Sequence, residues 1–303
     1  MDGVGLTSLW VAAMRAVETE RGEGALVHDP FARALAGDEG FEILERGKAT
    51  TPFDLPVIPI RTKWIDDRFA RTKLDQIVIL AAGMDARAFR LDSLAGKKVF
   101  EVDRDFVLAY KRERIEALGA KRRALRVGGV GGEAPDRETQ PKCDRVEVPV
   151  DLRDDWPTAL TNAGFDAKRP ALWLVEGLLV YLEEAHVRSL FARIDRLSRS
   201  PSASDTLAPK GSELVFESNN RVLLTAPVME QRLAFVRELG APWLFGADDP
   251  TTLLPPTWSA TVEDFAEAGI RYGRWPFPEA PKDMSKEILA SIPRSFLVHA
   301  TKL

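Results

Sequence analysis

Two residues of this chain have the type and the spacing needed to hold a nucleoside. Gly83 follows a short apolar run at 76–82, and Asp103 ends the next such run, twenty residues later. A glycine lets a ligand approach the backbone, and an acid at this spacing accepts hydrogen bonds from ribose hydroxyls in nucleotide-binding βαβ units. We therefore predict that Gly83 and Asp103 bind a ribose-containing cofactor. The alternative is that Asp103 only caps the helix after it.

The glycines that would cradle a diphosphate are missing from this unit. A dinucleotide site needs the pattern G-x-G-x-x-G between strand and helix, and only Gly83 is present here. The second glycine cluster, Gly128–Gly132, neither follows a strand nor opens a helix, so we predict a flexible loop there. The unit therefore suits a ligand with a ribose and no diphosphate, of which S-adenosylmethionine is the commonest. A nicotinamide-dependent oxidoreductase is the lesser alternative.

Two further acids follow apolar runs and are candidates for ligand contact. Asp151, with Leu152 beside it, follows the run at 145–150 and could bind an adenine amine and ring face, or could cap the next helix. Glu176 ends the run at 171–175, where a carboxylate needs a partner. That partner is a ligand ammonium group in one interpretation, and Arg15 or Arg61 in the other.

Composition excludes several classes of protein. The 303 residues carry a net charge of −4, which disfavours a nucleic-acid partner because phosphate neutralisation needs a basic face. A single cysteine, Cys143, and three histidines exclude a disulfide framework and make a metal site unexpected. No apolar run reaches about 18 residues and no secretory signal is visible, so we expect a cytoplasmic protein with no membrane partner.

The apolar pattern also predicts the elements that position these residues. The first 74 residues are expected to be helical, with one helix beginning at Asp29-Pro30 and another at Arg61. Short strands then alternate with helices, which indicates a doubly wound α/β sheet. The helix that begins at Asp105 is expected to stop at Gly119. The expected strands are 76–83, 98–103, 145–150, 171–177, 212–217 and 294–300.

Taken together, these segments resemble the leucine carboxyl methyltransferase superfamily. The likeness is greatest to its bacterial branch of S-adenosylmethionine-dependent methyltransferases, which includes polyketide O-methyltransferases. It covers roughly residues 6 to 220 and is less clear in the C-terminal third. The segments that carry it are Ala12–Thr19, Asp29–Ala32, Arg61–Asp67, Leu80–Leu91, Phe100–Asp103, Val150–Arg153 and Glu176–Leu182.

The resemblance implies a class I methyltransferase fold, Rossmann-like, with seven mostly parallel strands and an antiparallel last strand. It implies one domain, with a helical cap at 1–74, a cofactor-binding core at 75–218, a lid or insertion at 219–293 and the last strand at 294–303. It also implies that the strand-end residues line the cofactor site, that Arg61 binds the methionine carboxylate and that Arg15 is a basic cofactor contact. The strand-end set is Gly83, Asp103, Asp151, Leu152 and Glu176.

The expected activity is O-methylation of a carboxylate or hydroxyl on a small molecule. A carboxylate acceptor is already ionised and needs no general base, whereas a hydroxyl would need one, with Tyr181 or Glu176 as candidates. A catalytically silent cofactor-binding or scaffold protein is the main alternative, because its cofactor residues would look the same.

Overall fold

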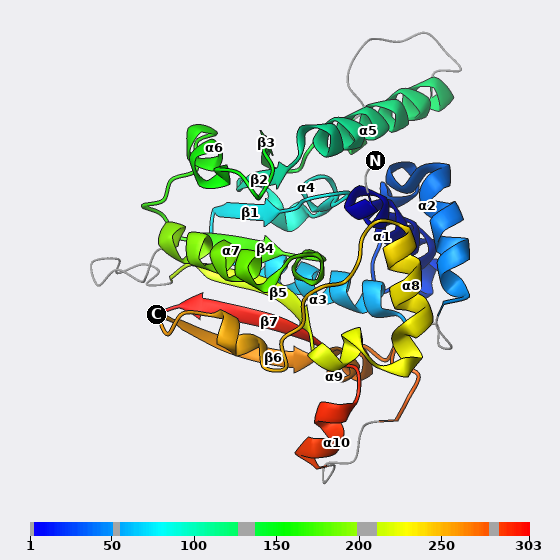
Figure 1. The fold of residues 1–303 in the computed structure, drawn as a ribbon. Helices are drawn as coiled ribbons and strands as arrows, with labels where there is room; N and C mark the ends of the chain where they lie inside the picture. The colour runs from blue at the N-terminus through cyan, green and yellow to red at the C-terminus, as the bar shows by residue number, and fades with distance from the viewer. Residues whose placement is uncertain (1–2, 51–54, 127–136, 199–210, 279–284) are drawn as a thin grey trace.

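A single seven-stranded sheet organises the chain. The computed structural model describes residues 3–50, 55–126, 137–198, 211–278 and 285–303. The strand order is β3-β2-β1-β4-β5-β7-β6, with β7 antiparallel to both of its neighbours and the first five strands parallel (Figure 1). This confirms the mostly parallel sheet with an antiparallel last strand. The strands are β1 (Gln76–Leu80), β2 (Lys98–Asp103), β3 (Asp144–Pro149), β4 (Ala171–Val175), β5 (Glu213–Asn219), β6 (Trp258–Asp264) and β7 (Ser295–Lys302).

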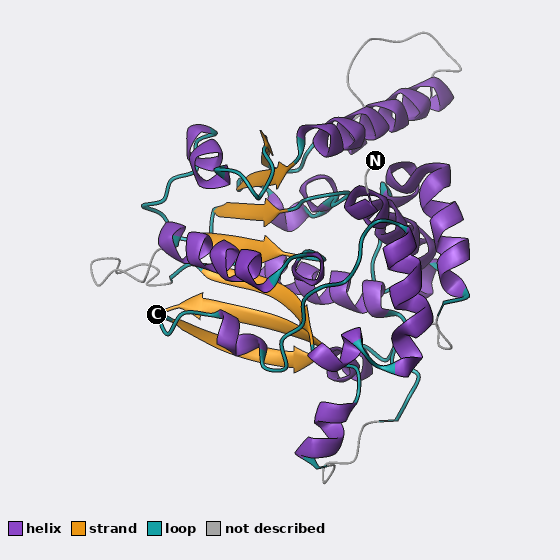
Figure 2. Cartoon of the chain, in the orientation of Figure 1, coloured by secondary structure: helices purple, strands orange, loops and turns teal. Residues whose placement is uncertain are grey.

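Helices cover both faces of the sheet and also gather beyond the carboxyl ends of its parallel strands. Figure 2 shows this gathering at the end toward which β1 and β4 point, where α1, α3 and α8 lie in Figure 1. The helices are α1 (Gly3–Thr19), α2 (Ala32–Lys48), α3 (Val57–Arg71), α4 (Arg87–Arg90), α5 (Asp105–Arg126), α6 (Trp156–Asn162), α7 (Glu184–Leu197), α8 (Glu230–Glu238), α9 (Phe265–Arg271) and α10 (Lys286–Ser291).

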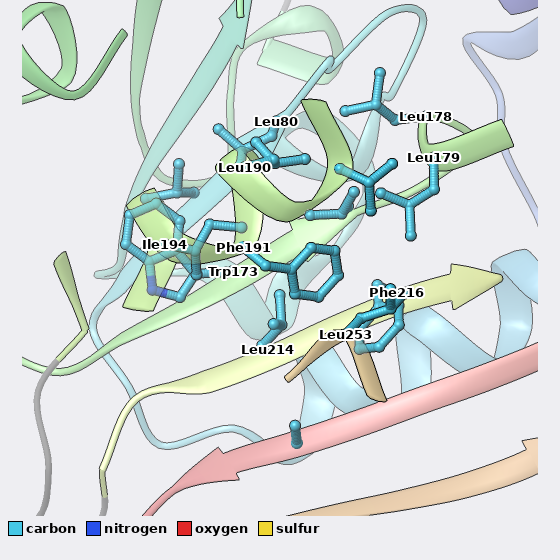
Figure 3. Close-up of a cluster of buried hydrophobic side chains, with 14 of the residues drawn as sticks. Leu80, Trp173, Leu178, Leu179, Leu190, Phe191, Ile194, Leu214, Phe216 and Leu253 are labelled. Carbon is cyan, nitrogen blue, oxygen red and sulfur yellow. The ribbon is translucent and has the colours of Figure 1, made fainter. Parts of the chain in front are cut away.

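The period-2 alternation of the strands divides the core into two layers. On one face, Trp173 and Phe216 pack against α7, whose apolar residues recur at helical spacing at Leu190, Phe191 and Ile194 (Figure 3). On the other face, side chains from β1, β4, β5 and β7 pack against α3 and α9. Because both faces are covered, β1 and β4 are apolar at nearly every position.

A third apolar cluster joins the N-terminal helices to the edge of the sheet. It unites α1, α2 and α8 with the segment after β1, and Trp10 of α1 meets Phe235 of α8 edge to face at 5.4 Å. The N-terminal helices are therefore packed directly over the carboxyl ends of the parallel strands. In doubly wound sheets, this is the edge at which ligands bind.

Several expected boundaries are wrong, each for a local reason. Helix α5 continues through Gly119 to Arg126. Gly119 does not end the helix but allows a close contact, since a Cβ there would lie 2.7 Å from Thr139 Oγ1. Helix α2 begins at Ala32, after a turn in which Asp29 accepts the Phe31 N–H at 3.1 Å. Helix α3 begins at Val57, one turn before Arg61.

One strand was not predicted from the apolar pattern. Strand β6 lies inside the expected lid at 219–293, and only Trp258 among its residues is buried, so it lacks the apolar run by which the other strands were found. The predicted loop at Gly128–Gly132 lies outside the described residues. Within the described ranges, no helix is long and apolar enough to cross a membrane.

Candidate functional site

The turn after β1 is tied to the end of β2. Ala81 and Gly83 both have positive φ, 53° and 44°, and the Gly83 N–H donates to Asp103 Oδ2 at 2.7 Å. A Cβ at Gly83 would lie 3.2 Å from Ser8 Cβ of α1. The turn is therefore held in a left-handed conformation, and α1 lies directly over it. For Ala81, which has a Cβ, this conformation is strained by about 1 kcal/mol or more.

Asp103 lies at the wall of a large cavity and is not a cap of α5. Its other oxygen, Oδ1, accepts the N–H of Arg104 at 2.7 Å, which precedes the helix. A carboxylate has about four lone-pair sites, so two remain for a ligand. Burial raises the pKa of Asp103 above its ordinary value, and the two backbone donors only partly oppose this. Gly83 and Asp103 are thus brought together as predicted.

Asp151 and Leu152 reach the same cavity from the end of β3. The Asp151 carboxylate accepts from Arg153 at its N–H, Nε and Nη2, at 2.9, 2.9 and 2.7 Å, and these bonds lower its pKa. The helix-cap interpretation of Asp151 is wrong, because the N-cap of α6 is Asp155, which accepts the Thr158 N–H.

A network of buried ion pairs joins α3 to the ends of β4 and β5. Arg61 Nε lies 2.8 Å from Glu176 Oε1, and Arg61 Nη1 lies 2.7 Å from Glu217 Oε1. The second oxygen of Glu176 lies 2.6 Å from Nη1 of Arg87, which also pairs with Asp85 and Asp66. The structure therefore shows the second interpretation of Glu176, an internal ion pair with Arg61.

The two glutamates of this network differ in proton affinity. Burial alone would raise the pKa of Glu176, but the Arg87 and Arg61 guanidinium groups outweigh it and hold that pKa well below its usual range. For Glu217, burial and the nearby Glu176 charge prevail over Arg61 and the Gly177 N–H, and the pKa is raised. Glu176 is thus a weak base, and Glu217 is the stronger base of the two.

Arg15 and Tyr181 border the cavity from α1 and from the turn after β4. Arg15 Nε lies 3.1 Å from Asp29 Oδ2, and its Nη2 donates to the Met84 carbonyl at 2.6 Å, so it fastens α1 to the turn after β1. Burial raises the pKa of Tyr181 more than the nearby Thr7 and Trp243 side chains lower it. All eight predicted site residues therefore line one cavity.

The cavity has a volume of about 1610 Å³, which exceeds the roughly 300–1,000 Å³ of a typical single-ligand site. There is room for a cofactor and a second molecule together. Sequence reasoning missed Glu217, although it follows the rule applied to Glu176: an acid near the end of an apolar strand. It also missed Ser8 and Trp243, which only the packing of α1 and of the segment after α8 brings here.

A family model described as leucine carboxyl methyltransferase matches residues 8–195 of the chain. The chain belongs to this family. A Streptomyces coelicolor protein named as an S-adenosyl-L-methionine-dependent methyltransferase is 36% identical over 91% of this chain and 88% of its own length. A Mycobacterium tuberculosis protein with the same kind of name is 40% identical over 69% of this chain and 68% of its own.

Two solved structures share the fold of this family member. A Streptomyces avermitilis protein of the DUF574 family aligns with a TM-score of 0.53 at 14% identity, covering 96% of this chain and 97% of its own. A Thermobifida fusca protein described as a methyltransferase aligns with a TM-score of 0.52 at 16% identity, covering 89% and 92%. Together with the sheet order, they place the chain in the class I methyltransferase fold.

Proposed function

We propose that this methyltransferase transfers the methyl group of S-adenosylmethionine to a carboxylate oxygen of a small organic acid. The cofactor follows from the family and from the names of its relatives, and the donor chemistry of the cavity fits it. Asp103 offers acceptors to ribose hydroxyls, Asp151 and Leu152 offer an acceptor and an apolar face to adenine, and Glu176 offers a carboxylate to an ammonium group. When bound, the cofactor supplies an electrophilic methyl group on a sulfonium.

Arg61 is the proposed contact for the methionine carboxylate, and it would share its guanidinium with Glu176 and Glu217. A guanidinium has five donors, of which these ion pairs use Nε and Nη1. Arg15 is the second proposed basic contact, from the side of α1. Residues 1–74 and part of 219–293 then form the cover that excludes water, over a cofactor-binding core at 75–218.

The observation that carries the choice of a carboxylate is the electrostatic state of the predicted bases. Glu176 is held between two arginines with a lowered pKa, and Tyr181 has a raised pKa, so both are poor proton acceptors near neutral pH. An acceptor carboxylate needs none. Its oxygen forms the new C–O bond as the methyl–sulfur bond breaks with its electron pair on sulfur, and no proton moves.

A hydroxyl acceptor is the second candidate, and Glu217 is the observation that favours it. Its raised pKa and its place on the cavity wall suit a general base better than Glu176 or Tyr181 do. In that case the acceptor hydroxyl would pass its proton to Glu217 as the C–O bond forms.

Labelled methyl transfer across matched acids and alcohols tests the proposal. We expect labelled methyl esters, released by mild base, and a rate that is level with pH above the pKa of the acceptor acid. If the labelled products are ethers that resist mild base, and they form at a rate that rises with pH, the acceptor is a hydroxyl and the carboxylate proposal is wrong. Cofactor binding without transfer to any member of the panel would instead favour a silent binding protein.

A further inference from the structure

Helix α1 and the C-terminal third of the chain line the cavity with apolar side chains. Helix α1 contributes Val11 and Met14, on the helical face that also carries Thr7 and Glu18. This face is distinct from the core face of α1, on which Leu9, Ala12, Ala13 and Ala16 are fully or almost fully buried. Met229, Trp243 and Trp275 complete the inner wall from the C-terminal third of the chain.

The rim of the cavity holds an unusual share of the exposed apolar side chains. Ten large hydrophobic residues are exposed among those that the structure describes, and five of them line this one cavity. An apolar surface gathered at the mouth of a cavity indicates a ligand that covers it, whereas scattered exposed residues need no explanation. The five are Val17, Val228, Ile270, Phe277 and Ile292, at 37–46% exposure.

The carboxylates that α1, β6 and α9 contribute to the cavity wall are all hydrogen-bonded to other groups of the chain. Both oxygens of Glu18 lie 2.9 Å from the Arg274 guanidinium, and Asp264 accepts from Arg294 at 2.7 Å. Glu267 accepts the backbone N–H of Asp264 in a capping box. Glu18 and Asp264 are therefore paired with cations, which disfavours a cationic ligand beside them.

Basic groups stand beside the same apolar wall. The Arg232 guanidinium lies 4.6 Å from the centre of the Trp10 ring, and both residues line the cavity. Burial lowers the pKa of Arg232 to about 10, so this cation lies in a poorly hydrated place. Arg21 and Lys48 also line the cavity, where Arg21 lies 3.8 Å from Glu18 and Lys48 lies 2.6 Å from Glu45. Apolar walls whose charged neighbours are largely paired match the apolar body of a ligand, and its negative charge is the carboxylate of the proposed function.

We propose that the methyl acceptor is an apolar carboxylic acid whose hydrocarbon body lies along α1 between Met14, Met229 and Trp243 and reaches the rim at Val228 and Phe277. This rests on the proposed function, and it narrows the acceptor from small organic acids in general to long or bulky apolar ones. A small polar acid would leave the Met and Trp wall in contact with water, whereas an apolar body covers it and gains the free energy of burial.

Binding of an alkanoate series to the full chain tests this class. The probes are hexanoate, octanoate, decanoate and dodecanoate, measured by calorimetry with S-adenosylhomocysteine at saturation. Burial of each methylene corresponds to a gain of roughly threefold to fourfold in affinity while the chain stays inside the cavity. Dodecylamine should bind at least about tenfold more weakly than dodecanoate, because Glu18 and Asp264 are already paired with cations.

A pair of exposed variants separates the cavity wall from the rest of the surface. Val228→Asp places a charge on the rim and should weaken dodecanoate binding about tenfold or more, with hexanoate affected less. Ile288→Asp makes the same kind of change at an exposed position of α10 that does not line the cavity, and it should leave both affinities within about twofold. S-adenosylhomocysteine should bind both variants as it binds the parent.

The outcomes distinguish this inference from the proposed function. Alkanoate affinity that does not change with length, with S-adenosylhomocysteine bound normally, overturns the apolar acceptor and leaves the methyltransferase proposal standing. No binding of S-adenosylhomocysteine overturns the proposed function itself. If Val228→Asp abolishes a dimer seen by light scattering and leaves the alkanoates unaffected, the rim is a surface for a second copy of this chain and the inference is wrong.

Discussion

Replacing Asp103 by asparagine tests the ribose contact at the centre of the proposed site. The substitution keeps the size of the side chain, removes its charge and turns one acceptor oxygen into a donor. The carboxylate now accepts the Gly83 and Arg104 N–H groups, both at 2.7 Å. The single asparagine oxygen cannot serve both backbone donors and a ribose, so at least one hydrogen bond to a charged group is lost.

The expected loss follows from that count. A hydrogen bond to a charged group contributes about 1.5–3 kcal/mol, so S-adenosylhomocysteine should bind about 10- to 150-fold more weakly. Methylthioadenosine, which keeps the ribose and lacks the amino acid, should lose affinity by the same factor. The fold should persist, because burial already raises the pKa of Asp103 and its ionised form gains little from folding. Calorimetry with both ligands gives the two factors.

The matched control is Asp105→Asn, the same change at an exposed position two residues along the chain. It should leave both affinities within about twofold. If Asp103→Asn is folded and binds S-adenosylhomocysteine as the parent does, the reasoning is refuted, and Asp103 only fixes the turn at Gly83. If methylthioadenosine is unaffected while S-adenosylhomocysteine is weakened, the carboxylate contacts some part of the cofactor other than the ribose.

Three further predictions concern the ionised groups. In Arg61→Lys, the lysine ammonium group cannot contact both Glu176 and Glu217, so S-adenosylhomocysteine should bind at least about tenfold more weakly, whereas the affinity for adenosine, which lacks the carboxylate, should change by less than about twofold. Equal losses for both ligands in calorimetry would indicate that Arg61 is only structural. Tyr181→Phe should slow labelled methyl transfer by less than about tenfold at an unchanged pH profile, and a lost alkaline limb would identify Tyr181 as a base. Lys111 and Arg145 outweigh the burial of Glu101 and lower its pKa from 4.5 to about 2, so its contribution to stability is present above pH 4.5 and is lost as the pH falls toward 2. Glu101→Gln should therefore lower the free energy of unfolding by about 3–5 kcal/mol at pH 7 and flatten the acid limb of stability in denaturant titrations, whereas Glu113→Gln, at an exposed position, should do neither.

The network around Arg61 explains why a buried glutamate is stable at the end of β4. Glu176 lies between guanidinium groups from α3 and α4 and keeps one side toward the cavity, so its charge is already partly balanced before any ligand arrives. Both elements are anchored by buried apolar residues, α3 against the sheet and α4 in the cluster of the N-terminal helices, which keeps the geometry in place. A ligand ammonium group would therefore meet a preorganised carboxylate, and little reorganisation would oppose binding.

The sequence by itself determined the sheet and the edge at which the site lies. The apolar runs that lead to Gly83, Asp103 and Glu176 are local signals, because a strand buried on both faces must be apolar and its end must not be. Parallel strands place their carboxyl ends at one edge of the sheet, so these residues had to meet there. Strand β6 escaped prediction because only Trp258 among its residues is buried and it carries no apolar run, although β3 at the other edge of the sheet was predicted.

Only the tertiary structure decided which charges meet. Arg61 and Glu217 are 156 residues apart, and their ion pair depends on how α3 packs across β4 and β5. Asp66 and Asp67 are much nearer to Arg61 along the chain, but Asp66 pairs with Arg87 and Arg90, and Asp67 pairs with Lys63 and Tyr272. The strength of an ion pair depends on the distance and burial of its two groups, and neither is set by spacing along the chain. The apolar wall of α1 is likewise visible only once the cavity shows which of its two faces is not in the core.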